Sequence, residues 1–229
     1  MSDIYTFLGH GTHQIEMDGI KLLVDPFLTG NPQAAISAKE ANPDYIYVSH
    51  GHGDHIGDTV AIARRTGAVV IANAEICGWL GKKDENLKVH AQHIGGGYQH
   101  PFGYLKMTIA FHGSGLPDGA EGGNPAGLLL RTNAGHKIYL ACDTGFFGDM
   151  QYIGDEGLDL AVLPIGDNFT MGPDDALKAV KLLRPKNVIP CHYNTWPPIE
   201  QDPDAWVARV NAETEAKAQV LAPGASFTL

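Results

Sequence analysis

The chain has 229 residues, of which 44% are hydrophobic, and its 26 acidic and 16 basic residues give a formal charge of −10. This length can bury a sizeable core, and we expect one domain over residues 1–229. No apolar run of about 18 residues occurs, so no membrane-spanning helix is expected. No lysine- or arginine-rich stripe occurs either, so we expect no nucleic-acid partner and no membrane partner.

Cysteine content and the first residues favour a reducing compartment. The three cysteines, Cys77, Cys142 and Cys191, follow no disulfide framework, and the N-terminus lacks the basic and apolar regions of a secretory signal. Both features predict a cytoplasmic location. The oligomeric state is open.

The first half of the chain begins with strand-like segments and continues with alternating strands and helices. Asp18-Gly19 is a typical hairpin turn, and Gly67 and Gly81 stand where helices are expected to end. The predicted elements are strands at 4–8, 13–17, 20–24, 45–49 and 68–72, and helices at 58–66 and 73–80.

The second half also mixes strands with helices. Pro173 followed by two aspartates is a good helix start, because proline needs no donor there and acids suit the positive end of the helix dipole. Strands mixed with helices in both halves predict an α/β fold in which two sheets pack face to face with helices outside. The predicted elements are strands at 104–111, 127–132, 137–141, 160–164, 187–189 and 226–229, and helices at 173–183 and 203–218.

The most informative segment is His50-Gly-His-Gly-Asp-His55, which follows the predicted strand at 45–49. It places three imidazoles and one carboxylate within six residues, and zinc and other transition metals bind both groups. The two glycines permit a sharp turn, so that successive side chains can converge. The segment predicts a metal site, and we expect a site for two ions.

Further candidate ligands stand where later strands give way to loops. His112, Asp143 and His192 each follow an apolar run, and a rigid scaffold aims side chains at such positions. The chain thus offers seven candidate ligands, which is about the number that two adjacent ions need. They are His50, His52, Asp54, His55, His112, Asp143 and His192.

The order of these seven residues resembles the metallo-β-lactamase superfamily, and the similarity runs from about residue 4 to residue 229. Other segments resemble one branch of it, a family of stand-alone, largely uncharacterised metal-dependent hydrolases. These segments are Phe7-Leu-Gly-His10, Val24-Asp-Pro-Phe27, Gly122-Gly-Asn-Pro125, residues 164–171 and residues 190–196.

The resemblance implies a four-layer αββα sandwich of two mixed β-sheets, with metals at the sheet edges. It further implies a first metal on His50, His52 and His112, a second on Asp54, His55 and His192, and Asp143 between them. Cys142 departs from the pattern, because such families commonly have glycine before the bridging aspartate. Since side chains alternate along a strand, we expect Cys142 to point away from the metals, as Cys191 should beside His192.

The expected chemistry is metal-dependent hydrolysis. Two divalent ions can lower the pKa of a shared water to about 7, which predicts a metal-bridging hydroxide that cleaves an ester, lactone, thioester, amide or phosphodiester bond of a small molecule. Zinc is the first choice, and manganese, iron and nickel also suit these ligands. The alternatives are a nuclease or phosphodiesterase of the same superfamily and a non-catalytic metal-binding protein.

Several residues have possible supporting roles. Asp54 could orient the hydroxide, and His10 could be a partner of a metal ligand, a proton donor, or simply a core or surface histidine. Asp25 could hydrogen-bond a metal-bound histidine, or cap a turn. Trp196 could rim the pocket. The candidates for lining the pocket or contacting substrate are His93, Asn124, Asn168 and Tyr193, although loop asparagines more often satisfy local backbone.

Overall fold

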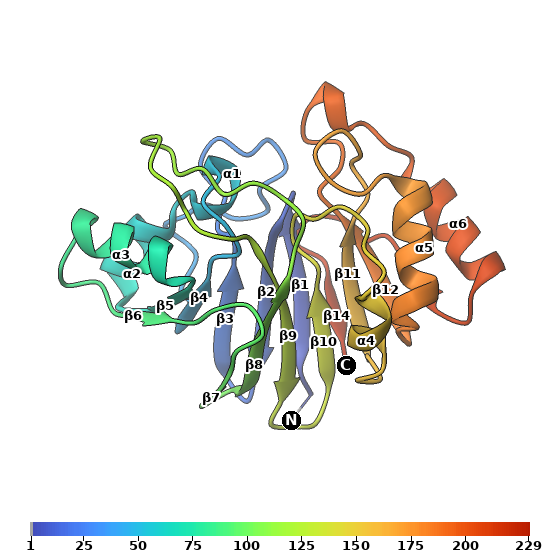
Figure 1. The fold of residues 1–229 in the computed structure, drawn as a ribbon, viewed down its shortest axis with the longest axis horizontal. Helices are drawn as coiled ribbons and strands as arrows, with labels where there is room; N and C mark the ends of the chain where they lie inside the picture. The colour runs from blue at the N-terminus through green and yellow to red at the C-terminus, as the bar shows by residue number, and fades with distance from the viewer. Residues whose placement is uncertain (1) are drawn as a thin grey trace.

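The computed structural model describes residues 2–229. Two seven-stranded sheets face each other, and helices cover their outer faces (Figure 1). The predicted αββα sandwich is therefore confirmed. Within the described residues, no helix combines the length and apolar character needed to cross a membrane.

The first sheet contains the N-terminal strands together with the last strand of the chain. It is antiparallel from β14 through β3 and parallel from β3 through β6. Its strands, in the order β14-β1-β2-β3-β4-β5-β6, are β14 (Ser226–Thr228), β1 (Ile4–Gly9), β2 (Thr12–Met17), β3 (Ile20–Val24), β4 (Tyr45–Tyr47), β5 (Val69–Ala72) and β6 (Val89–Ala91).

The second sheet repeats this plan. It is antiparallel from β7 through β10 and parallel from β10 through β13. Its strands, in the order β13-β12-β11-β10-β9-β8-β7, are β13 (Lys217–Ala218), β12 (Asn187–Cys191), β11 (Leu160–Pro164), β10 (Lys137–Leu140), β9 (Ala126–Thr132), β8 (Gly103–Ile109) and β7 (Gly97–His100).

The helices divide between the two outer faces (Figure 1). The first sheet carries α2 and α3, and the second carries α4, α5 and α6, while the short α1 lies in the loop after β4. Their bounds are α1 (Gly53–Ile56), α2 (Thr59–Thr66), α3 (Ala74–Lys83), α4 (Met150–Gly154), α5 (Pro173–Leu183) and α6 (Pro203–Glu213), with a 3₁₀ turn η1 (Pro197–Ile199).

A core between the sheets fixes their relative position. Alternate residues of β8, Leu105 and Met107, point into this core and meet Leu128 of β9 and Tyr5 of β1. Burying each such side chain stabilises the fold by roughly 1.5–3 kcal/mol. Because the sheets cannot slide past one another without losing these contacts, the strand ends that carry the candidate ligands stay in register.

All three cysteines are buried, and Cys142 and Cys191 lie in the core, as expected. Cys142 and Cys191 belong to the core between the sheets, and Cys77 belongs to the core between the first sheet and its helices.

Two predicted helix ends are wrong. Gly81 does not end the second helix, because α3 continues to Lys83; the buried Leu80 and the basic residues of its last turn outweigh the roughly 1 kcal/mol cost of one helical glycine. The last helix ends at Glu213 and not at residue 218. There the Thr214 hydroxyl donates to the Val210 carbonyl and accepts from the Ala216 amide, so that the chain turns into β13.

Six short elements were missed. They are α1, α4, β6, β7, β13 and η1, each of two to five residues. Segments of this length show too few periods of apolar residues to reveal their structure.

Candidate metal centre

Four segments bring the candidate ligands to one edge of the two sheets. His50 lies three residues beyond β4, and Asp54 and His55 lie on the one-turn helix α1. His112 stands three residues beyond β8, Asp143 three residues beyond β10, and His192 directly follows β12. The structure thus brings together all seven residues that the sequence singled out as ligands.

The first set of donors contains His50, His52 and His112, whose ring nitrogens lie within 4.8 Å of one another. His50 Nε2 is 3.0 Å from His52 Nδ1. Donors on a tetrahedral zinc ion, at about 2.0–2.1 Å from it, lie roughly 3.4 Å apart. The spacing of these three nitrogens therefore suits one ion.

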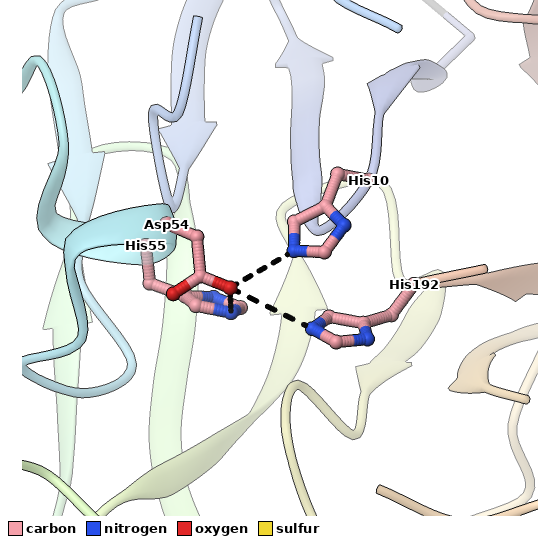
Figure 2. A group of neighbouring side chains, drawn as sticks. All are labelled: His10, Asp54, His55 and His192. Atoms are coloured by element: carbon pink, nitrogen blue, oxygen red, sulfur yellow. Dashed lines mark hydrogen bonds and ion pairs between the residues drawn. The ribbon is translucent and has the colours of Figure 1, made fainter. Parts of the chain in front are cut away.

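The second set of donors contains Asp54, His55 and His192, and His10 joins it (Figure 2). Asp54 Oδ2 lies 3.1 Å from His10 Nε2, 3.7 Å from His55 Nε2 and 4.0 Å from His192 Nε2. Figure 2 shows the three rings converging on this one oxygen.

Asp143 lies between the two sets. Its Oδ2 is 3.5 Å from His112 Nε2 of the first set, and 3.3 Å and 3.1 Å from the Nε2 atoms of His55 and His192 of the second. Burial alone would raise the pKa of Asp143, but the charges of His192 and His55 hold it well below its usual range. A buried carboxylate anion therefore stands where a ligand shared by two cations would be needed.

Three buried ring nitrogens at this centre make no hydrogen bond within residues 2–229. They are His55 Nε2, His192 Nε2 and His192 Nδ1, and the first two face Asp143 Oδ2 without bonding to it. Buried polar atoms are rarely left unsatisfied. Imidazole nitrogens and carboxylates are ligands for zinc and other transition metals, so the residues present fit divalent ions.

One carboxylate, Asp25, supports a ligand of each set. Its Oδ2 accepts from His55 Nδ1 at 2.9 Å and from the Ser49 hydroxyl at 2.5 Å, and its Oδ1 accepts from the Ser49 amide. Ser49 Oγ in turn lies 2.9 Å from His50 Nδ1. Because the serine proton goes to Asp25, the serine oxygen accepts from His50. Both rings are thus held with Nε2 turned toward the centre.

His10 is a core histidine that touches the second set. Its Nδ1 lies 2.7 Å from Thr195 Oγ1, and its ring centroid lies 4.0 Å from that of His192. Burial, and secondarily His192, lowers the pKa of His10 to about 4. The neutral ring satisfies both its contacts when Nε2 donates to Asp54 and Nδ1 accepts from Thr195.

Left-handed backbone conformations occur at several of these strand ends. His10, Asp25, Cys142 and His192 have φ of 57°, 47°, 52° and 53°, and each costs roughly 1–2 kcal/mol for a residue other than glycine. The chain bends at Gly51 and enters α1 at Gly53, as the sequence suggested, but neither glycine has a positive φ. Gly51 is needed for space instead, since a Cβ there would lie 2.8 Å from the Ser114 carbonyl oxygen.

A pocket of about 620 Å³ opens over the centre. The candidate ligands form the polar part of its wall, and the rest of the wall is mostly apolar. The lining consists of His52, Gly53, Asp54, His112, Asp143 and His192, and of Phe27, Phe169, Trp196 and Pro198. Trp196 therefore borders the pocket, as the sequence suggested.

The remaining predicted substrate contacts lie outside the lining of this pocket. His93 is exposed, with Nε2 3.8 Å from Glu75 of α3. Tyr193 is buried in the core outside the second sheet. Asn168 is exposed next to the pocket residue Phe169, and Asn124 borders a second cavity beside His112. A loop position near a predicted ligand was not enough to predict that these four residues line the pocket.

Sequence reasoning missed the residues that support the ligands. Ser49 and Thr195 are polar residues of common types, and the Gln33 side chain accepts from the His10 amide at 3.1 Å. Gly11 was also missed, although a Cβ there would lie 2.9 Å from the His55 ring. Adjacency to a ligand, as Ser49 to His50, was the only signal available for them.

Comparisons with known proteins agree with this geometry. A family model described as a beta-lactamase superfamily domain matches residues 21–193. A UPF0173 metal-dependent hydrolase from Pelotomaculum thermopropionicum is 50% identical over 230 residues, which cover 98% of this chain and 99% of that protein. Another UPF0173 metal-dependent hydrolase, from Thermus thermophilus, is 47% identical over 218 residues, with 95% of each chain covered.

Solved structures extend the agreement. Igni18, a metallo hydrolase from the archaeon Ignicoccus hospitalis, matches with a TM-score of 0.90 and 36% identity over 100% of this chain and 99% of that chain. The metallo-beta-lactamase fold protein YhfI from Bacillus subtilis matches with a TM-score of 0.78 over 100% of both chains, and its 13% identity supports the fold alone. The chain therefore belongs to the beta-lactamase superfamily, and within it to the UPF0173 metal-dependent hydrolases.

Proposed function

We propose that this metal-dependent hydrolase binds two divalent cations and cleaves an ester, lactone, thioester, amide or phosphodiester bond of a small molecule. The main support is the position of Asp143, whose Oδ2 lies within 3.5 Å of Nε2 atoms from both donor sets. When bound, such ions polarise a substrate oxygen and lower the pKa of water to about 7.

The chain's own residues orient these groups. Asp25 and Ser49 fix the His50 and His55 rings, so the metal ligands do not have to reorganise. Asp54, exposed to the pocket on one side and held by His10 on the other, is placed to accept a proton from a water molecule there. In the hydrolysis, water supplies OH to one product and H to the other, and one substrate bond breaks.

The part of the pocket wall formed by Phe27, Phe169, Trp196 and Pro198 is mostly apolar. Phe27, Phe169 and Trp196 provide aromatic surface for a substrate, and aromatic side chains bind flat apolar groups well. This wall supports a small molecule as the substrate, in preference to a nucleic acid. Three free, buried cysteines support a reducing, cytoplasmic location.

The first experiment is metal analysis of the purified protein, followed by a screen of chromogenic esters, lactones, thioesters, amides and phosphodiesters. We expect two equivalents of metal and turnover of at least one bond class, with zinc the best ion and manganese, iron and nickel as comparison arms. His52→Ala, which removes a donor of the first set, should bind about one equivalent and lose turnover.

Two results would contradict the proposal. Equal turnover in the wild type and His52→Ala would show that the activity comes from elsewhere. A fully loaded protein that cleaves no bond in the panel would favour a non-catalytic metal-binding protein.

A further inference from the structure

A second cavity lies beside the candidate centre. It measures about 500 Å³ and shares His112 with the first pocket. Its remaining lining is apolar except for Asn124, and consists of Ile94, Ile109, Ala110, Phe111, Asn124 and Pro125. A candidate metal ligand therefore stands in the walls of two separate hollows.

Side chains around both cavities expose apolar surface to solvent. Seven large hydrophobic residues are exposed in residues 2–229, and three of them border the two cavities. Phe111 is 57% exposed, Phe169 is 55% exposed and Ile109 is 40% exposed. Clustered exposed apolar residues beside a pocket are typical of a ligand-binding surface.

Phe111 is held in place by contacts of its ring and its backbone. Its ring packs edge-on against Phe147, with centroids 5.5 Å apart and planes at 75°. Its amide donates to Thr144 Oγ1 at 2.9 Å, and its carbonyl accepts from the Gly145 amide at 3.0 Å. The exposed face of the ring is therefore held by these contacts just beyond the end of β8, two residues after Ile109.

The charge of the two cavity linings indicates which chemical groups the cavities can bind. Among the described residues, neither cavity has a lysine or arginine in its lining. A carboxylate or phosphate placed away from the metals would have no cationic partner, and its desolvation would be uncompensated. Neutral groups suit both cavities.

We propose that the substrate carries two neutral apolar groups, one on each side of the bond that is cleaved, and that the cavity formed by Ile109 and Phe111 binds the second of them. The inference rests on the proposed function, because His112, which lines both cavities, is a ligand of the proposed ions. It assigns Phe111 and Ile109 as specificity residues.

The affinities of hydroxamic acids test the two-cavity proposal without requiring turnover. A hydroxamate chelates a divalent ion through two oxygens, and its carbonyl and nitrogen substituents can be varied separately. We would titrate zinc-loaded protein of measured metal content with acetohydroxamic acid and with N-phenylbenzohydroxamic acid, by calorimetry. If each ring contributes roughly tenfold, the two-ring compound should bind about 100-fold more tightly.

Substitutions in each cavity test which residues cause the tighter binding of the two-ring compound. Phe111→Ser and Phe169→Ser should each reduce the 100-fold preference to about tenfold, and Ile109→Ser should reduce it in part. Affinity for acetohydroxamic acid should stay the same and reports an intact centre. Tyr152→Ser, at a residue of α4 that is 65% exposed and outside both linings, is the matched control and should keep the full preference.

The outcomes separate this inference from the proposed function. A wild-type preference that survives both Phe111→Ser and Ile109→Ser, or no preference in the wild type, overturns the two-cavity inference and leaves hydrolysis untouched. The expected binding pattern in a protein that cleaves no bond of the panel contradicts only the hydrolase proposal. A protein that takes up no ion contradicts both.

Discussion

The two halves of the molecule have the same strand plan but contribute to the centre in different ways. In both, an antiparallel ribbon leads into parallel strands. The first half supplies His50, His52, Asp54 and His55 from a single loop after β4. The second half supplies His112, Asp143 and His192 one at a time, from the ends of β8, β10 and β12. The first contribution is local in sequence, and the second depends on the sheet.

The supports of these ligands differ in the same way. In the first half, side chains do the positioning, because Asp25 and Ser49 bind the His50 and His55 rings. In the second half, backbone does more of it. The Phe111 and Gly145 amides tie the His112 and Asp143 segments together, and the His192 amide donates to the His10 carbonyl at 2.9 Å. Substitutions of supporting residues in the first half should therefore mainly reduce metal affinity and turnover. Those in the second half should mainly reduce the free energy of unfolding.

The largest effect should come from Asp143→Asn. This change removes the anion that lies next to both donor sets. Since losing an outer partner of a metal ligand costs roughly 10–100-fold, losing this group should reduce turnover more than about 100-fold and leave fewer than two equivalents of metal. Metal analysis together with turnover of the best screened substrate measures both. Two retained metals with near wild-type turnover would show that Asp143 is not shared.

Asp25→Asn should have the next largest effect. An amide offers one acceptor oxygen where the carboxylate has two, so it cannot accept from His55, the Ser49 hydroxyl and the Ser49 amide together, and the rings of one ligand from each set lose their orientation. We expect metal affinity to fall roughly 10–100-fold, measured by competition with a chelator.

Asp3→Asn is the matched control for this change. Asp3 is equally buried and accepts from His136 Nδ1 at 2.7 Å, outside the centre. Its substitution should alter stability and leave metal affinity unchanged. Equal losses of affinity in both variants would mean that Asp25 acts only through folding.

The contrast between the halves also explains what the sequence could predict. The cluster from His50 to His55 is visible because its donors are adjacent. His112, Asp143 and His192 were predicted because each follows an apolar strand, and parallel strands bring their ends to one edge. The resemblance to a known superfamily then supplied the grouping into two sets, which the donor distances match.

The supports could not be predicted because their partners are remote. Ser49 binds Asp25 across 24 residues, and Thr195 binds His10 across 185, with no periodic signal to connect them. Helix α1 has four residues, about one turn, which no apolar periodicity can reveal. The loop residues His93 and Asn168 had no strand to fix their direction, and they lie outside the pocket lining.

A smaller effect on the centre is expected for Thr144→Val in the second half. Thr144 is fully buried and its hydroxyl accepts from the Phe111 amide, so valine leaves that amide without its partner. We expect roughly 1–3 kcal/mol less free energy of unfolding, measured by urea denaturation, and at most a few-fold change in metal affinity. Thr59→Val is the control, because Thr59 Oγ1 is buried with no partner in residues 2–229, and its loss should cost little. If Thr144→Val lost much of its metal affinity with an unchanged free energy of unfolding, the proposed difference between the two halves would be contradicted.

The smallest effect concerns His100, where β7 of the second sheet meets β6 of the first, away from the metals. Its ring stacks on Phe102, lies 4.8 Å from the ring of His90, and is also bordered by Tyr45 and Tyr98. Burial, with the charge of His90, lowers the pKa of His100 to about 4. Because the unfolded chain takes up this proton near pH 6.5 and the folded chain does not, the contribution of His100 to stability is complete above pH 6.5 and is lost as the pH falls toward 4.

Comparison with His100→Phe isolates the effect of proton uptake by this one ring. In metal-free protein, the difference in free energy of unfolding between wild type and variant should be constant above pH 7 and should move against the wild type between pH 6.5 and 4. Its slope cannot exceed about 1.4 kcal/mol per pH unit for a single group. In separate metal-loaded samples, wild type and variant should bind the same amount of metal. A difference that stays flat down to pH 4 would mean that His100 takes up its proton in the folded protein as readily as in the unfolded chain, and that the contact between β6 and β7 opens to admit it.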